Sequence, residues 1–406
     1  MKLKRSQMLS IALLSAATGL ASAGTVTSDG QDLVIKSKGD LGVETADGKN
    51  SFAIGGRIQV DYNSYDGVIN KGAEGETGSD LFFRRARLAL KGKIDGVWKY
   101  KMQFNVNEAD GGDVEDLYIA YTGLGSLAQL TLGQQKEPFG LEELTSSKYI
   151  TAIERSMPTN AYAPGRNVGL KLNGHQGMMT YAVGAFRQGN GPDNEMDLAL
   201  TGRVTAAPIA SGSNVVHLGA GFSQRDGEFN DINARLGVRG GAGKTANKYA
   251  ASYISGDADE QQVWNIEGAV VSGPVHVQAE YFDSSLSGRN GAPDLDSSGY
   301  YAQAGWFLTG ESRPYDTGDG AFGKVAPSSS GGAWELFARY DNMDADSAAG
   351  ISLPTGESAN TMTLGANWYA NKNVRVGINY VRADTDQAIN GEDSGNALVA
   401  RTQLIW

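Results

Sequence analysis

The chain has 406 residues, with 35 Lys and Arg against 46 Asp and Glu, 3 His and no Cys, and its formal charge is −11. The absence of Cys excludes disulfides, Cys-ligated zinc and thiol catalysis, and the net acidity disfavours a nucleic-acid-binding protein, whose domains are usually basic. No apolar run is long enough to cross a membrane as a helix. This length therefore leaves two or three soluble domains or one large β-barrel.

The first residues have the pattern of a cleaved export leader. A basic start and a short apolar stretch precede Ala21-Ser22-Ala23, which forms an A-x-A cleavage site. We therefore expect a signal peptide over residues 1–23 and a mature chain that begins with an N-terminal segment over residues 24–50. Cleavage removes three basic residues, so the exported protein has a formal charge of −14. A buried N-terminal helix is the alternative interpretation.

From Ser51 onward, polar and apolar residues alternate. In residues 98–107, one face reads Lys, Lys, Gln, Asn, Asn, and the other reads Trp, Tyr, Met, Phe, Val. A period of two places alternate side chains on opposite faces of a strand. Many such segments of about ten residues are typical of a transmembrane barrel, whose sheet closes because lipid offers the backbone no hydrogen-bond partners.

Seventeen segments fit this pattern, one more than an even-stranded antiparallel barrel admits, so one is misread. We predict an all-β fold, a 16-stranded antiparallel transmembrane β-barrel over residues 51–406. The candidate strands are residues 52–64, 81–94, 97–108, 114–123, 127–136, 166–174, 177–188, 197–207, 214–225, 230–240, 262–273, 274–285, 298–310, 332–342, 360–370, 373–383 and 396–406.

The links between these segments differ in length. Short links predict turns on the periplasmic side, and long polar links predict external loops at residues 70–79, 284–297, 310–331 and 342–359. The chain ends on Trp406, which resembles the C-terminal assembly signal of bacterial outer-membrane barrels. A secreted β-sandwich or β-helix is the soluble alternative.

The order of motifs along the mature chain resembles the phosphate- and polyphosphate-selective outer-membrane porins. The motifs are Gly24-Thr25-Val26-Thr27, Gly55-Gly56-Arg57, Phe83-Arg84-Arg85-Ala86, Trp98-Lys99-Tyr100, Phe139-Gly140-Leu141-Glu142, Thr145-Ser146-Ser147-Lys148, Glu154-Arg155, Asn214-Val215-Val216-His217-Leu218-Gly219, Leu308-Thr309-Gly310-Glu311 with Arg313, Gly332-Ala333-Trp334-Glu335-Leu336 and Asn367-Trp368-Tyr369-Ala370-Asn371. The resemblance implies a homotrimer of 16-stranded barrels, each with a long loop folded into its lumen. Residues 137–165 match that constriction loop, and a flexible external loop is the alternative.

Positive charge on the polar face suits an anion channel. By alternation, Arg57, Arg85, Arg87, Lys99 and Lys101 point into the lumen. Arginine is always charged and its planar group forks onto phosphate oxygens, and rings of Arg or Lys select anions in pores. For each residue, a solvated lumen wall without a role in selectivity is the alternative.

The resemblance assigns roles to further residues. It implies that Arg57, Arg84 and Arg85 belong to an arginine ladder. It also implies that Lys99 and Arg155 contribute positive charge to a central anion site, where Glu115 stands in place of the family's Asp. Arg84 and Arg85 cannot both face the lumen in a regular strand, so we expect a strand end or a bulge there.

Three positions depart from the family pattern. Glu143 replaces a Lys in the constriction loop, which reverses a charge at the expected narrowest point, while Lys136 and Arg87 each replace a Tyr. Two cations are gained and one is lost. We therefore expect anion preference to be retained and leave tight phosphate specificity open.

Together these features predict a passive bacterial outer-membrane channel for small anions, phosphate or polyphosphate, set in lipid as a homotrimer. We expect no enzymatic activity, no cofactor or metal and no nucleic-acid partner. The alternatives are a general or weakly cation-preferring porin and a non-conducting structural or adhesive barrel.

Overall fold

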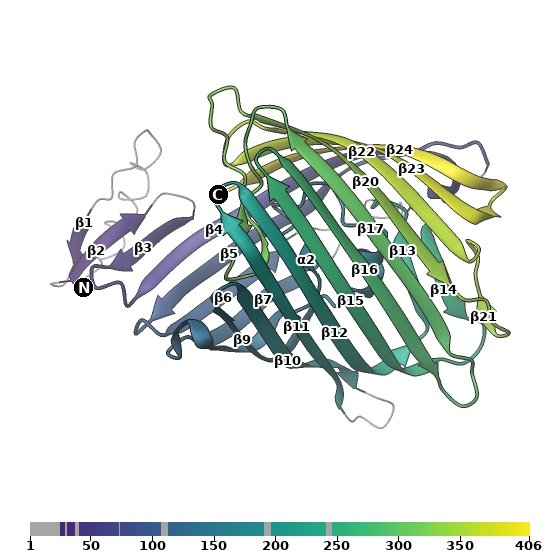
Figure 1. Cartoon of the computed structure of the whole chain (residues 1–406), viewed down its shortest axis with the longest axis horizontal. Helices are drawn as coiled ribbons and strands as arrows, with labels where there is room; N and C mark the ends of the chain where they lie inside the picture. Colours follow the sequence, from purple (N-terminus) through teal and green to yellow (C-terminus); the bar gives the residue numbers. More distant parts are fainter. Residues whose placement is uncertain are drawn as a thin grey trace, which may run out of the picture.

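The computed structural model describes residues 25–28, 31–36, 40–72, 74–106, 113–190, 196–240 and 246–406, so the predicted leader at residues 1–23 lies outside the described residues. Sixteen long strands form the wall of a barrel (Figure 1). They are β4 (Ser51–Tyr65), β5 (Gly78–Ile94), β6 (Trp98–Asn105), β7 (Asp113–Tyr121), β8 (Gln129–Lys136), β9 (Arg166–Gln176), β10 (Met179–Asn190), β11 (Met196–Ser211), β12 (Asn214–Phe229), β15 (Ala258–Ser272), β16 (Val275–Gly288), β17 (Leu295–Phe307), β20 (Ala333–Ala345), β22 (Ser358–Tyr369), β23 (Val374–Ile389) and β24 (Glu392–Ile405).

The wall closes because its last strand pairs with its first. β24 runs antiparallel to β4, from Ala397 opposite Tyr65 to Ile405 opposite Arg57. The expected alternation is clear along β15 and β17, where buried and exposed residues take turns almost without exception. The exposed positions carry large apolar side chains such as Trp264 and Ile266, and the buried positions face inward. The predicted closed barrel of sixteen strands is confirmed.

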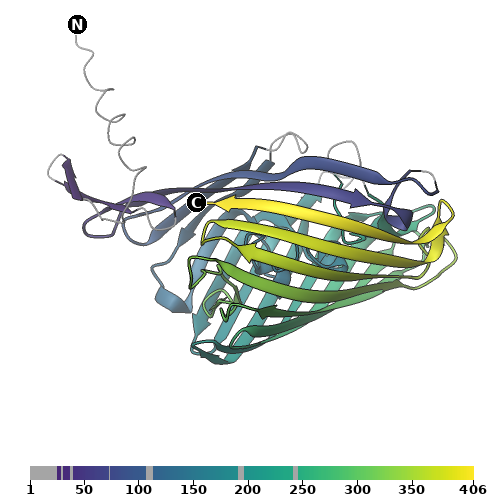
Figure 2. The ribbon, with the colours of Figure 1, turned by 90° about the horizontal axis from the view of Figure 1, so that it is seen from above.

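Three short strands precede the wall. These are β1 (Thr25–Ser28), β2 (Gln31–Lys36) and β3 (Leu41–Thr45), and β3 pairs with the start of β4. They form a small sheet that projects beyond the barrel at the end where β4 begins (Figures 1 and 2). None of the helices in the described ranges is long and apolar enough to cross a membrane.

The misread segment is residues 230–240. It contains β13 (Asp231–Arg235), which pairs with β14 (Lys248–Tyr253) and, through it, with β21 (Ile351–Ser352), in a sheet separate from the wall. The segment alternates as a wall strand does because any sheet with two different faces produces a period of two. Alternation alone therefore does not separate an internal sheet from the barrel wall.

Residues 137–165 connect β8 to β9 and fold inward, as expected. They contain α2 (Leu141–Leu144) and α3 (Met157–Tyr162). Backbone groups of this loop are bound by inward side chains from distant strands: Arg375 on β23 donates to the carbonyl of Ile150, and Gln403 on β24 donates to that of Lys148. The loop therefore crosses the lumen from its own side of the barrel to the opposite wall.

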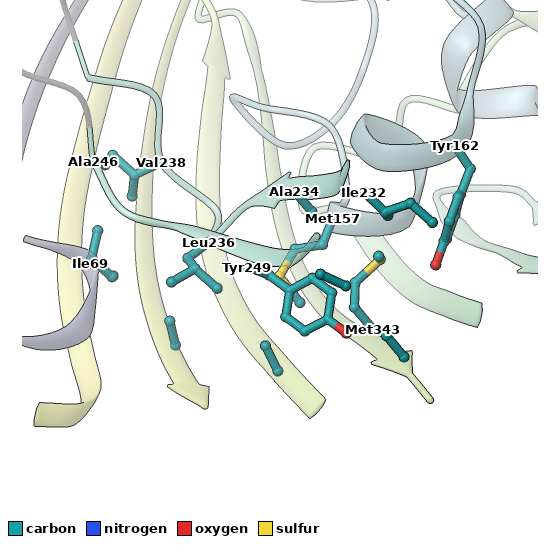
Figure 3. Packing of buried hydrophobic residues seen from close by; sticks show 14 of the residues in the cluster. Ile69, Met157, Tyr162, Ile232, Ala234, Leu236, Val238, Ala246, Tyr249 and Met343 are labelled. Atoms are coloured by element: carbon teal, nitrogen blue, oxygen red, sulfur yellow. The ribbon is translucent and has the colours of Figure 1, made fainter. Parts of the chain in front are cut away.

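A large apolar cluster fills part of the lumen around β13 and β14. Met157 and Tyr162 of α3 meet Tyr249 of β14 and Met343 of β20 (Figure 3). The short helix η2 (Gly67–Ile69) and the inner faces of β16, β17, β22, β23 and β24 add buried apolar residues. We call this group the apolar cluster. It fixes residues 230–240 and β14 against the inside of the wall.

One predicted loop is on the wrong side. The sequence suggests an external loop over residues 310–331, but counting strands places the link from β17 to β20 at the end with the short turns. This link contains β18 (Tyr315–Asp316) and β19 (Ala321–Phe322) and folds into the barrel, where the Phe322 amide donates to Thr145 Oγ1 at 3.3 Å. Another helical turn, η4 (Gly125–Leu127), joins β7 to β8 at this end. Length and polarity misled the prediction because this link packs its apolar residues inside.

Candidate functional site

A bulge in β5 brings two adjacent arginines into the lumen. Gln59 of β4 faces Arg85 and the next residue, Val60, faces Phe83, so Arg84 is the extra residue on β5. A bulged strand breaks the strict alternation of side chains at that point. Both Arg84 and Arg85 are consequently buried. The bulge expected from the sequence is present.

A second bulge does the same for two acidic residues. Gln103 of β6 faces Asp116, and Phe104 faces Val114, which leaves Glu115 as the extra residue on β7. Glu115 and Asp116 are both buried inside the barrel. The two bulges therefore place a pair of adjacent cations and a pair of adjacent carboxylates on neighbouring parts of the inner wall.

These residues surround a cavity of about 300 Å³ between the wall from β4 to β9 and the loop of residues 137–165. We call it the central cavity. Its cationic lining consists of Arg57, Arg85, Arg87, Lys101, Lys136, Arg155, Arg166 and Lys171.

Carboxylates hold several of these cations in place. Glu115 pairs with Arg87 and, at 2.9 Å, with Arg166. Asp116 contacts Arg166 at 2.7 Å and Lys101 at 2.6 Å. Counting Glu115, Asp116, Glu143 and Asp319 against the eight cations leaves a formal excess of four positive charges.

Arg57 and Arg85 differ from the paired cations. Both bind neutral side chains: Arg57 Nη1 donates to Ser147 Oγ at 2.6 Å, and Arg85 Nη1 donates to Gln59 Oε1 at 2.9 Å. Within the described part of the chain, the buried Nε of each arginine has no hydrogen-bond partner. A buried donor without a partner is energetically unfavourable. The two guanidinium groups therefore line the cavity with charge that no carboxylate pairs with in the described residues.

Glu143 is neutralised by its neighbours. Its carboxylate lies 2.8 Å from Lys136 Nζ and 3.0 Å from Arg155 Nε. Burial by itself raises the pKa of Glu143, but the charges of Arg155 and Lys136 outweigh it and hold that pKa below its usual range. Lys136 and Glu143, which both depart from the family pattern, are thus in direct contact with each other. The charge reversal noted in the sequence is compensated locally.

Arg84 and Lys99 lie outside the central cavity. Arg84 donates to both oxygens of Glu154, at 2.7 and 3.0 Å. Arg401 of β24 bridges the same Glu154 and Asp61 of β4. Lys99 is exposed near the short-turn end, with its Nζ 3.4 Å from Gln129 Oε1.

Of the ten residues selected from the sequence, six line the cavity: Arg57, Arg85, Arg87, Lys101, Lys136 and Arg155. Glu115 forms an ion pair with Arg87, and Glu143 forms ion pairs with Lys136 and Arg155. Sequence reasoning missed Asp116, Arg166 and Lys171. Lys171 left a signal, because it shares the polar face of β9 with Asn167, Gly169 and Asn173. Arg166 left none, because it follows the loop directly and alternation does not fix its direction.

Comparison with known proteins gives consistent similarities. A family model described as "Phosphate-selective porin O and P" matches residues 52–406. "Porin O" of Pseudomonas aeruginosa is 36% identical over 97% of this chain and 97% of its own length. A protein of Caulobacter vibrioides described as uncharacterised is 26% identical, covering 73% of this chain and 62% of its own length.

Solved structures share the fold at low sequence identity. An anion-selective porin from Comamonas acidovorans superposes with a TM-score of 0.60 at 14% identity, covering 88% of this chain and 100% of that one. The trimer form of OmpT, an outer-membrane protein of Vibrio cholerae, gives 0.56 at 13% identity, covering 88% and 99%.

Proposed function

Because the chain belongs to the phosphate-selective porin O and P family, we propose that its central cavity binds and passes small phosphate-type anions by passive diffusion. The protein is a porin of the bacterial outer membrane. The observation that carries the proposal is the pair of unneutralised guanidinium groups, Arg57 and Arg85, at a cavity with an excess of positive charge. Phosphate oxygens are suited to guanidinium groups, which bind them through charge-assisted hydrogen bonds.

The carboxylates of the cavity act as supports in this mechanism. Glu115 and Asp116 hold Arg87, Lys101 and Arg166 in fixed positions, and Glu143 holds Arg155 and Lys136. They also lower the total charge of the cavity. Conduction requires binding strong enough for entry and weak enough for exit, and a partly compensated cluster meets both conditions.

The loop of residues 137–165 narrows the pore and carries Arg155 to the site. Arg84 serves this role indirectly, because its bond to Glu154 fastens the loop to β5. Lys99, exposed at the short-turn end, attracts anions at the periplasmic mouth. This assignment places the ladder residues Arg57 and Arg85 at the site and Arg84 in its support.

The structure supports a general or cation-preferring porin less than the sequence alone does. The sequence feature that favoured it was Glu143, and Lys136 and Arg155 neutralise that residue. A non-conducting barrel gains some support from the apolar cluster, which fills part of the lumen. The central cavity lies on the other side of the lumen, along β4 to β9, and leaves polar space beside the cluster.

The wall itself supports a trimer. β6 and β8 have only 8 residues each, whereas a tilted strand needs about 9–11 to cross a bilayer. A wall this short is poorly matched to lipid. We therefore assign this side to contact with a second subunit of a homotrimer, and place the outward apolar residues of the longer strands in lipid.

The test is electrical. Purified channels in a planar bilayer are placed in a KCl gradient, and the zero-current potential is measured before and after phosphate is added at millimolar concentration. We expect a chloride-directed potential and a chloride current that phosphate blocks. A cation-directed potential contradicts the proposal in favour of a general porin, and absence of conductance favours the structural barrel.

A further inference from the structure

A second cavity of about 140 Å³ lies beside the central cavity, next to β9, β10 and β11. Gly174 and Tyr181 contribute to its lining and stand close to the short turn between β9 and β10. That turn lies at the periplasmic end. We call this space the exit cavity, because an anion that leaves the central cavity toward the periplasm on this side passes through it.

Three residues line both cavities and therefore mark the boundary between them: Leu144, Lys171 and Asp319. They come from three separate elements. Leu144 ends α2 of the inward loop, Lys171 is on the wall strand β9, and Asp319 is on the turn between β18 and β19. An ion crossing the boundary meets one apolar, one cationic and one anionic side chain.

The turn that carries Asp319 is held rigidly. Asp316 Oδ1 accepts the amides of Gly318, at 2.8 Å, and Asp319, at 3.2 Å, while Arg203 on β11 donates to the carbonyl of Gly320 at 2.8 Å. Gly320 has φ +60, and a Cβ there would lie 2.9 Å from Thr205 Oγ1. The backbone is therefore seated directly on the wall, and Asp319 keeps its place at the boundary.

The Asp319 carboxylate is exposed to the lumen, and no hydrogen bond or ion pair joins it to another residue in the described ranges. The charged groups that act on it are Asp316, Lys171, Lys99 and Arg203. Arg203 is itself engaged by Glu267 at 2.6 Å. Asp319 is thus a fixed negative charge on an anion path, in contrast to the carboxylates that support the central cavity.

We propose that Asp319 forms an electrostatic barrier between the central cavity and the periplasmic exit, and that Lys171 opposite it lowers this barrier. The inference rests on the proposed anion channel and adds a residue that determines the rate and direction of release. Because the charge stands on one side of the central cavity, it affects exchange with the periplasm more than exchange with the outside.

The experiment compares phosphate block from the two sides of oriented single channels. In a wet pore, a unit charge within several ångströms of the ion path changes the local anion concentration by about threefold. In Asp319→Asn we expect the half-blocking concentration from the periplasmic side to fall about threefold, and the value from the external side to stay unchanged or rise. Asp319→Glu retains the wild-type values. Asp95→Asn is the matched control, since Asp95 is exposed in the turn after β5, outside both cavities, and its φ of +50 suits Asn.

Lys171→Gln gives an independent test that does not alter the turn. Removal of the opposing cation leaves Asp319 uncompensated, so the half-blocking concentration from the periplasmic side rises by more than the external value. Equal changes from both sides, or no change in either variant, overturn the role of Asp319 while the anion channel stands. Failure of phosphate to block the wild type from either side instead contradicts the proposed function itself.

Discussion

The two sides of the lumen are built from the same kind of wall but filled differently. Along β4 to β9, Arg57, Arg85 and their cationic neighbours surround an open cavity. Toward β16 to β24, Phe282 and Met343 are covered by α3 and β14 in the apolar cluster. Unpaired charges are costly to remove from water, whereas apolar surfaces are stabilised by excluding it. In the proposed mechanism, anions therefore pass off-centre, along the charged side of the lumen.

The largest expected effect comes from removing the unneutralised charge on the open side. In Arg57→Gln/Arg85→Gln we expect the phosphate concentration for half-block to rise at least about tenfold, because each charge-assisted hydrogen bond contributes roughly 1.5–3 kcal/mol. Titration of the chloride current with phosphate measures it. Arg382→Gln is the control, since Arg382 is on the outer face and pairs with Asp384. An unchanged titration in the double variant would place the anion site elsewhere.

The next test disrupts the packing of the apolar cluster. Tyr249 is fully buried in the apolar cluster, and truncation of a large buried aromatic costs about 3–5 kcal/mol. We expect Tyr249→Ala to loosen β13 and β14, with faster proteolysis of these strands and a larger, noisier single-channel conductance. Ile254→Ala, on the exposed end of the same segment, should change neither quantity. A Tyr249→Ala channel as quiet as wild type would show that the cluster does not restrict the path.

Acid should release the loop that separates the two sides. Burial opposes ionisation of Glu154, yet Arg84 and Arg401 hold its pKa well below the usual range, and the pKa of Glu143 is lowered by Arg155 and Lys136. A lowered folded-state pKa means that the stabilisation is complete above the ordinary carboxyl pKa and is lost as the pH falls through the lowered value.

We therefore expect pepsin to cleave residues 137–165 increasingly as the pH decreases below about 4. Glu154→Gln should show the same cleavage at a higher pH, while Glu392→Gln, at the external start of β24, should match wild type. Cleavage that is independent of pH in both the wild type and Glu154→Gln would contradict this stabilisation.

The smallest effect concerns Lys148, near the periplasmic end of the proposed anion path. Burial, and then the charge of Arg57, lower the pKa of Lys148 to about 8. Its positive charge is therefore lost as the pH rises through that value, and we expect the anion-to-cation permeability ratio to fall about twofold between pH 7 and 9. Lys148→Arg keeps the charge and should remove this pH dependence. Zero-current potentials at a series of pH values measure it, and an equal decline in Lys148→Arg would assign the change to another group.

The sequence alone was sufficient to predict the barrel and most of the cations of the cavity. Alternation is a local property, so residues such as Arg57, Arg85, Arg87 and Lys101 reveal their face through their immediate neighbours. The same rule misled at residues 230–240, because an internal sheet alternates as the wall does. Alternation also did not predict that residues 310–331 enter the barrel from the short-turn end.

Only the tertiary structure decided which charged side chains have an oppositely charged partner. Glu143 reads as a repulsive charge in the sequence, but the inward path of its loop brings it against Lys136 and Arg155. The bulge at Glu115 and the position of Asp319 likewise depend on register and on segments far apart in the chain. The sequence by itself determined the alternation, and therefore the closed wall and its charged inner face. The tertiary structure decided the ion pairing, because electrostatic interactions depend on distances in space that no local pattern specifies.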